Sequence, residues 1–147
     1  MKSIILHFDG TSKPNPGKSA CAFVICDETG HEIEKQGRYL GDGTNNIAEY
    51  LGLILGLIRV LRYDSDRILI YSDSNLVIQQ IRGNYRVKDI DLKKLYIIAT
   101  EILKFFSEVK IEYIPHEKNI AHSIAQSYLE TGSVSYTHLT LPTIYSV

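Results

Sequence analysis

The chain has 147 residues, enough for one domain with a hydrophobic core and too few for two. Its 16 Lys and Arg residues against 17 Asp and Glu residues exclude a global basic field, so any nucleic-acid partner would have to be held by local patches. The longest apolar stretch, residues 47–61, contains two charged residues and is shorter than the ~20 residues that span a bilayer. We therefore expect a soluble protein without a membrane segment.

Residues 4–17 begin with an apolar run and end in a loop rich in Gly, Pro and Asn. Ile4, Ile5, Leu6 and Phe8 make this run apolar on both parities, which is typical of a central strand covered on both faces. Asp9 follows directly, at the predicted end of this strand. The loop after it allows the backbone to approach a ligand closely. Asp9 is therefore either a site carboxylate or a residue that starts a turn through its own side chain.

The remaining elements follow in chain order. Helix 46–62 is apolar around most of its circumference and should pack centrally on the sheet, with Gly52 and Gly56 allowing close approach. The other predicted strands are 19–26, 31–40 (a polar edge strand), 67–72 and 109–115, and the other predicted helices are 73–82, 91–106 and 119–130. The order β-β-β-α-β-α-α-β-α favours an α/β fold with a five-stranded mixed sheet and helices on both faces.

The two cysteines indicate the cellular compartment, and the C-terminal residues indicate where the domain ends. Cys21 and Cys26 have opposite parity in one predicted strand, so they cannot pair with each other. Together with an N-terminus unlike a secretory signal, this favours the cytoplasm. We expect the domain to cover residues 1–131. Residues 132–147 are expected to be a non-native tail, because 133–147 have no charge and no helical period; the alternative is an edge segment packed on the sheet.

Three acids carry the predicted chemistry. Asp9 and Asp73 follow two predicted strands that would be neighbours in a mixed sheet, and Glu49 lies in the first turns of the central helix. Such acids would repel one another unless cations lay between them, and carboxylates with open positions suit Mg²⁺. Each acid also has a structural alternative. Glu49 could form a capping box with Asn46, and Asp73 could cap the helix that follows it.

Five motifs together resemble ribonuclease H type 1 in its compact form, namely DGTSKPNPG, TNNIAEY, SDSNLV, GNYRVK and PHEKNIA. The resemblance implies a ribonuclease H-like fold and an endonuclease that hydrolyses the RNA strand of RNA–DNA hybrids, leaving 3′-hydroxyl and 5′-phosphate ends. It implies two metal ions, Mg²⁺ or Mn²⁺, held by the catalytic residues Asp9, Glu49 and Asp73, and no obligate protein partner. By motif position, the contacts to the hybrid are Asn15, Thr44, Asn45, Asn46, Asn75, Tyr85, Arg86 and Lys88.

The chain departs from the family at the fourth acid, which the family places at the start of the last helix. Without a gap this place falls on Ser123, whereas one deletion restores the apolar face of the helix and places His122 there. We favour His122 for this place, where it is either a catalytic metal ligand, since imidazole can bind metals, or a bystander. The missing acid leaves open a catalytically impaired hybrid-binding module. A nucleotide-dependent kinase or ATPase of the same broad fold would need a second lobe, for which the chain is too short.

Overall fold

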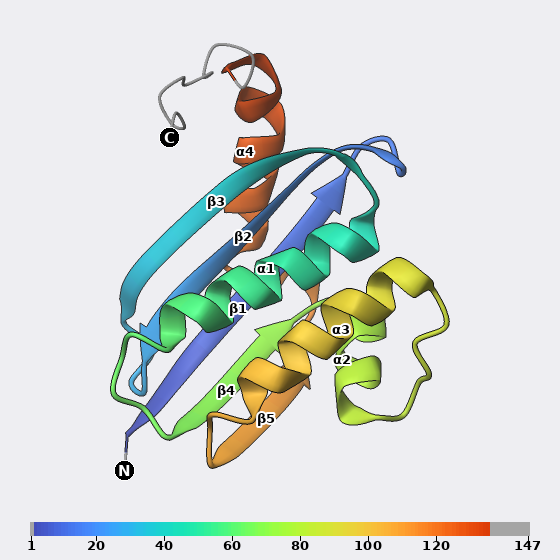
Figure 1. Ribbon diagram of the computed structural model, residues 1–147. Helices are drawn as coiled ribbons and strands as arrows, with labels where there is room; N and C mark the ends of the chain where they lie inside the picture. Colours follow the sequence, from blue (N-terminus) through green and yellow to red (C-terminus); the bar gives the residue numbers. More distant parts are fainter. Residues whose placement is uncertain (1, 136–147) are drawn as a thin grey trace, which may run out of the picture.

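A computed structural model describes residues 2–135 of the chain (Figure 1). The predicted order of elements is confirmed. The strands are β1 (Ser3–Ser12), β2 (Gly17–Asp27), β3 (Glu32–Gly43), β4 (Arg67–Ser72) and β5 (Glu108–Tyr113). The helices are α1 (Asn45–Val60), α2 (Asn75–Arg82), α3 (Ile90–Leu103) and α4 (His122–Ser135), with a short 3₁₀ turn, η1 (His116–Lys118), before the last helix.

The five strands form one mixed sheet in the order β3-β2-β1-β4-β5. β1 runs parallel to β4 and antiparallel to β2, and β4 runs parallel to β5. Helices α1 and α3 cover one face of the sheet and α4 covers the other (Figure 1). The predicted α/β class, the mixed sheet and the edge position of β3 are therefore confirmed.

The hydrophobic core lies mainly between the sheet and α1. Leu6 and Phe8 on β1, Leu53 and Leu57 on α1 and Ile70 on β4 are all fully buried. A smaller apolar cluster under α4 contains Ala22, Val24 and Ala125, among others. This arrangement follows from strands that are apolar on both parities, since each face of the sheet needs a covering helix.

Glycines set the distance between α1 and the sheet. A Cβ built on Gly10 would lie 2.2 Å from the Ala48 carbonyl carbon and 2.2 Å from the Glu49 nitrogen, both in the backbone of α1. A Cβ on Gly52 would lie 2.7 Å from the carbonyl oxygen of Asp9. The predicted close approach at Gly52 is therefore confirmed, and its partner on the sheet is the backbone of β1 beside Asp9.

β1 is paired unevenly on its two sides. Its ladder with β4 covers only Ser3 to His7, whereas its ladder with β2 continues from Ile4 to Ser12. The prediction that the strand ends at Asp9 was wrong, because the antiparallel neighbour extends it. Asp9 instead lies just past the point where β1 loses β4. Past this break, the carbonyl oxygen of Phe8 on β1 accepts a hydrogen bond from the side chain of Asn119, which lies just before α4.

Three further predictions concern membrane spans, cysteine pairing and the C-terminal segment. Within residues 2–135, none of the helices is both long and apolar enough to cross a bilayer. Cys21 and Cys26 are buried free thiols, so the prediction that they do not pair is confirmed. α4 extends to Ser135, into the segment predicted as a tail, and residues 136–147 lie outside the described part of the chain.

Candidate active site

Asp9 is the most deeply placed of the three predicted acids. Its residue is only 3% exposed, although it carries an ionisable group. Burial and the nearby carboxylate of Asp73 raise the pKa of Asp9 to about 7, although a hydrogen bond with His122 partly opposes this rise. A buried carboxyl group next to a second one is unfavourable for the isolated protein, and such groups are common at functional sites.

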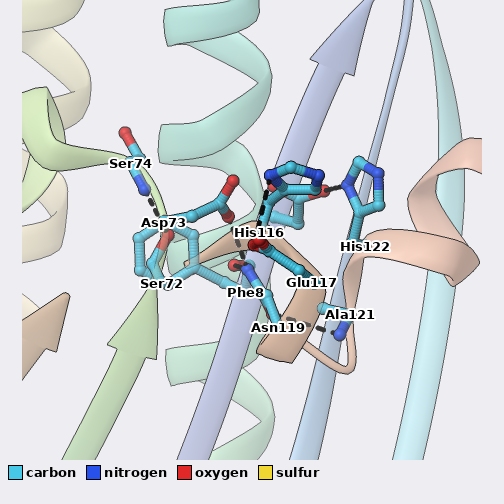
Figure 2. Close-up of polar contacts among 10 residues, drawn as sticks. Phe8, Ser72, Asp73, Ser74, His116, Glu117, Asn119, Ala121 and His122 are labelled. Carbon is cyan, nitrogen blue, oxygen red and sulfur yellow. Dashed lines mark hydrogen bonds and ion pairs between the residues drawn. The ribbon is translucent and has the colours of Figure 1, made fainter. Parts of the chain in front are cut away.

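Asn119 connects Asp73 to the broken edge of β1. Its side-chain nitrogen donates to Asp73 Oδ1 at 2.7 Å and to the carbonyl oxygen of Phe8 at 2.9 Å (Figure 2). Its side-chain oxygen accepts from the backbone N–H of Ala121 at 3.1 Å. Asn119 is 4% exposed, so its amide is a structural part of the site. The sequence reasoning did not identify this role, which depends on a partner far away in the chain.

Glu49 and Asp73 do not cap helices. The N-cap of α1 is Thr44, whose side chain accepts from the Ile47 N–H, so the proposed capping box was wrong. Ser74, rather than Asp73, caps α2. Ser74 Oγ also donates to Glu49 Oε1 at 2.7 Å. Both structural alternatives are thereby excluded, because neither carboxylate caps a helix.

The pKa of Glu49 is also raised, to about 7. Burial is the largest cause, and the carboxylates of Asp9 and Asp73 add to it, while the Ser74 hydrogen bond opposes it. Glu49 on α1 accepts from Ser74, the residue after Asp73, and Asp73 follows β4, the parallel neighbour of the strand that carries Asp9. Asp9 and Glu49 are therefore each close enough to the other carboxylates for their negative charges to raise the pKa.

His122 lies beside the acids, whereas Ser123 does not. The Nδ1 atom of His122 is 3.0 Å from Asp9 Oδ2. The rings of His122 and His116 meet edge to face, with centroids 5.4 Å apart (Figure 2). Ser123 is exposed and lines a hollow against β3 together with Lys35. Of the two candidates for the place of the fourth acid, only His122 contacts one of the three carboxylates.

The chemistry of these donors fits a divalent cation. Within residues 2–135, neither Lys nor Arg forms an ion pair with Asp9, Glu49 or Asp73, so no permanent positive charge neutralises them. The same described region contains no group of three His, Cys, Asp or Glu side chains already arranged as metal ligands. Glu49 is turned to Ser74 and Asp73 to Asn119. The acids are gathered in one place, therefore, but their side chains are held by protein partners.

The predicted polar contacts near the first loop form one group. Asn15 Oδ1 accepts from the backbone N–H of Asn45 at 3.1 Å, which ties the Gly- and Pro-rich loop to the start of α1. Thr44, Asn45 and Asn46 are half-buried at that helix N-terminus. Asn75 is exposed at the start of α2, where its side-chain oxygen accepts from Gln79.

A second group surrounds the loop between α2 and α3. Tyr85, Arg86 and Lys88 line a surface cavity of about 540 Å³, and Lys93 and Tyr96 of α3 line it too. The sequence reasoning missed these last two residues. Their spacing of three on a helix that follows a basic and aromatic loop was the available signal. The cavity therefore combines cationic and aromatic side chains from two elements.

Comparison with known proteins identifies the family. The reverse transcriptase-like family matches residues 7–128. The crystal structure of RNase H1 from Halobacterium salinarum is 30% identical, has a TM-score of 0.82 and covers 88% of this chain, which in turn covers 98% of that structure. The chain belongs to the ribonuclease H type 1 family.

Two further relatives have the same fold. The N-terminal RNase H domain of Rv2228c from Mycobacterium tuberculosis has a TM-score of 0.89 at 29% identity, with 92% of this chain and 99% of that domain covered. The whole bifunctional protein Rv2228c is 32% identical over 90% of this chain, which spans only 37% of that protein. LC11-RNase H1, solved in complex with an RNA/DNA hybrid, has a TM-score of 0.82 at 29% identity, covering 88% of this chain and 98% of that one.

Proposed function

We propose that this ribonuclease H domain is a metal-dependent endonuclease that hydrolyses the RNA strand of RNA–DNA hybrids, leaving 3′-hydroxyl and 5′-phosphate ends. The observation that carries the proposal is the meeting of Asp9, Glu49 and Asp73 from three elements at the break between β1 and β4. The hybrid bound to LC11-RNase H1, which has the same fold, supports the substrate class. The two free, buried cysteines fit a cytoplasmic protein.

The three acids and His122 are the groups that would hold the metal. Carboxylate oxygens suit Mg²⁺ and Mn²⁺, and imidazole nitrogen is accepted more readily by Mn²⁺. Two divalent ions, when bound, can activate a water on one side of a phosphodiester and stabilise the leaving oxygen on the other. Asp9 and Glu49 have raised pKa values without a metal, so part of each is protonated near neutral pH. A bound cation would lower these pKa values and favour the ionised forms.

The other residues of the chain hold and orient the site. Asn119 fixes the rotamer of Asp73, and Ser74 fixes that of Glu49. Asn15 and Asn45 offer amide groups that can bond to a 2′-hydroxyl or a phosphate without adding charge. Around the cavity, Arg86 and Lys88 supply positive charge and Tyr85 supplies an aromatic ring, which would lie along the backbone of the other strand of the hybrid.

The substrate test compares duplexes of one sequence. We expect cleavage of the RNA strand in an RNA–DNA hybrid and at least about 10³-fold slower cleavage of the all-DNA duplex, because polar groups that bond a 2′-hydroxyl are left unpaired when it is missing. End-labelled strands resolved on denaturing gels measure both rates, with double-stranded RNA as a third substrate. Equal rates on DNA and hybrid would contradict the proposed specificity. Tight hybrid binding without any cleavage would identify an impaired binding module instead.

The metal test concerns His122. We expect His122→Asp to raise the Mg²⁺-dependent cleavage rate about tenfold, equivalent to about 1.4 kcal/mol in the barrier, because an oxygen donor and a negative charge replace a nitrogen. The parent protein should work better with Mn²⁺ than with Mg²⁺. Initial rates titrated with each metal give both the affinity and the maximal rate.

Ser123→Asp is the matched control, since it adds the same charge one residue away on the side that faces β3. It should leave the Mg²⁺ rate unchanged. A gain from Ser123→Asp instead of His122→Asp would move the fourth ligand position to Ser123. His122→Ala should lower the Mn²⁺-dependent rate if the imidazole is a ligand and have little effect if it is a bystander.

A further inference from the structure

Two buried polar side chains connect α1 to α2, the helix that leads into the basic loop. Tyr50 is fully buried on α1, one residue after Glu49, and Gln80 on α2 is only 4% exposed. The Tyr50 hydroxyl donates to Gln80 Oε1 at 2.6 Å. Burial raises the pKa of Tyr50, and the nearby Tyr96 adds to this rise, so the hydroxyl stays protonated and donates at neutral pH. Polar groups buried in an apolar core are costly unless they bond to each other, so this pair constrains how α1 and α2 pack.

Gln80 also holds the loop between α2 and α3, at two points. Its backbone oxygen accepts from the Gly83 N–H at 3.0 Å, and its side-chain nitrogen donates to the carbonyl oxygen of Arg86 at 3.5 Å, a long contact. Within residues 2–135, no other hydrogen bond reaches the backbone of residues 86–88. Val87 packs against the core and is the apolar anchor of the same stretch. The Gln80 amide is therefore the polar anchor of the basic part of the loop.

The side chains of this loop are the ones expected to contact the hybrid. Tyr85, Arg86 and Lys88 are all exposed and line the cavity of about 540 Å³. An exposed loop loses conformational entropy when it binds a ligand, and this cost weakens the affinity. A loop that is already held in the free protein has less entropy to lose. The carbonyl group that Gln80 holds belongs to Arg86, one of the two cations of the loop.

We propose that Tyr50 and Gln80 are positioning residues, which hold the basic loop in a fixed place relative to Glu49. The phosphates that the loop binds would then be in register with the bond that is cut. The inference rests on the proposed function, because it takes the loop as a contact to the hybrid. Neither Tyr50 nor Gln80 touches the substrate, since both are buried. Their loss should therefore weaken hybrid binding and its dependence on salt more than it slows the chemical step.

The test removes both polar groups of the pair together. The combination Tyr50→Phe with Gln80→Met keeps the shape of the core and leaves neither partner unpaired, so Tm should stay close to that of the parent. We expect the Kd for a hybrid in Ca²⁺ and the KM for cleavage to rise about five- to tenfold, with a change in kcat of less than about twofold. The slope of log Kd against log salt should fall by about one to two, because each lost phosphate contact removes about 0.7–0.9.

Tyr63→Phe is the matched control. Tyr63 lies just after α1, and its hydroxyl donates to Glu34 Oε1 at 2.7 Å, a bond similar to that of Tyr50 but with a residue of β3. This variant should keep the parental Kd, KM and salt slope. Tyr50→Phe alone should change all three in the same direction as the double variant, and it keeps the proposal testable if the double variant is unstable.

A direct measurement on the loop separates positioning from a general effect on the fold. Trypsin cleaves after Arg86 and Lys88, so the rates of cleavage at these two sites, followed by mass spectrometry, report how often the loop opens. We expect these rates to rise at least about fivefold in the double variant and to stay unchanged in Tyr63→Phe. A parental Kd and salt slope in the double variant would overturn this inference alone. A parent protein that binds no hybrid would overturn the proposed function, and this inference with it.

Discussion

Asp73→Asn and Asp9→Asn are each expected to lower the cleavage rate on the order of 10³-fold or more, while hybrid binding stays close to that of the parent. Each change removes a negative charge that the proposed cations need, but it keeps the size and most hydrogen bonds of the side chain. Cleavage rates and the Kd for a hybrid measured in Ca²⁺ separate the two effects. Turnover that survives in either variant would place the metal site elsewhere.

Asp9→Asn should lose activity without losing thermal stability. The pKa of Asp9 is about 7 in the folded protein against an ordinary value of 3.8, so the unfolded chain ionises first as the pH rises. Stability is therefore lost between about pH 4 and pH 7, and a side chain that cannot ionise avoids this loss. In EDTA at pH 7, Asp9→Asn should have a Tm equal to or above that of the parent. Asp64→Asn, at an exposed residue, is the control and should change Tm little. A large drop in the Tm of Asp9→Asn would mean that the inactive variant is simply misfolded.

Gly10→Ala is expected to destabilise the protein by about 3 kcal/mol, which lowers Tm by roughly 6–12 °C in a domain of this size. The new methyl group would meet backbone atoms of Ala48 and Glu49 at 2.2 Å, and a helix backbone cannot rotate away as a side chain can. α1 would have to move off the sheet and take Glu49 with it. A displacement of about 1 Å at a catalytic group can cost on the order of 10² in rate, so activity should fall as well.

Gly43→Ala is the matched control for this substitution. A Cβ there would meet the Ser19 hydroxyl oxygen at 3.1 Å, which is a longer contact and involves a side chain rather than the backbone of α1. Thermal unfolding and hybrid cleavage should both stay near the parent values in this variant. If Gly10→Ala were as mild as Gly43→Ala, the close packing of α1 on β1 would not be what fixes the distance between Asp9 and Glu49.

The sequence was sufficient for the elements and for the three acids, because both depend on local patterns. Strands that are apolar on both parities and a helix that is apolar around its circumference required a covered sheet with α1 at its centre. Asp9 and Asp73 could be placed together once their strands were taken as neighbours. The order of elements and the family motifs carried that step.

The contacts that orient the three acids could not be predicted from local sequence patterns. The role of Asn119 depends on Phe8 and Asp73, which are distant in the chain, and a polar residue before a helix looks locally like a cap. The extension of β1 past Asp9 depends on β2, because only the antiparallel ladder continues there. Thr44 displaced Asn46 as the N-cap, a shift of two residues that local propensity does not resolve.

The bonds that Asn119 and His122 make to β1 also bear on how the chain folds. Asn119 is 111 residues away from Phe8, and His122 is 113 residues away from Asp9. Contacts of such separation form only after large loops have closed, and the entropy of that closure delays them relative to the helix pairs and hairpin around them. During synthesis, β1 leaves the ribosome long before residue 119 exists. A nascent chain can therefore complete most of the sheet while its catalytic centre is still open, and within this domain nuclease activity should appear only after the sheet has formed.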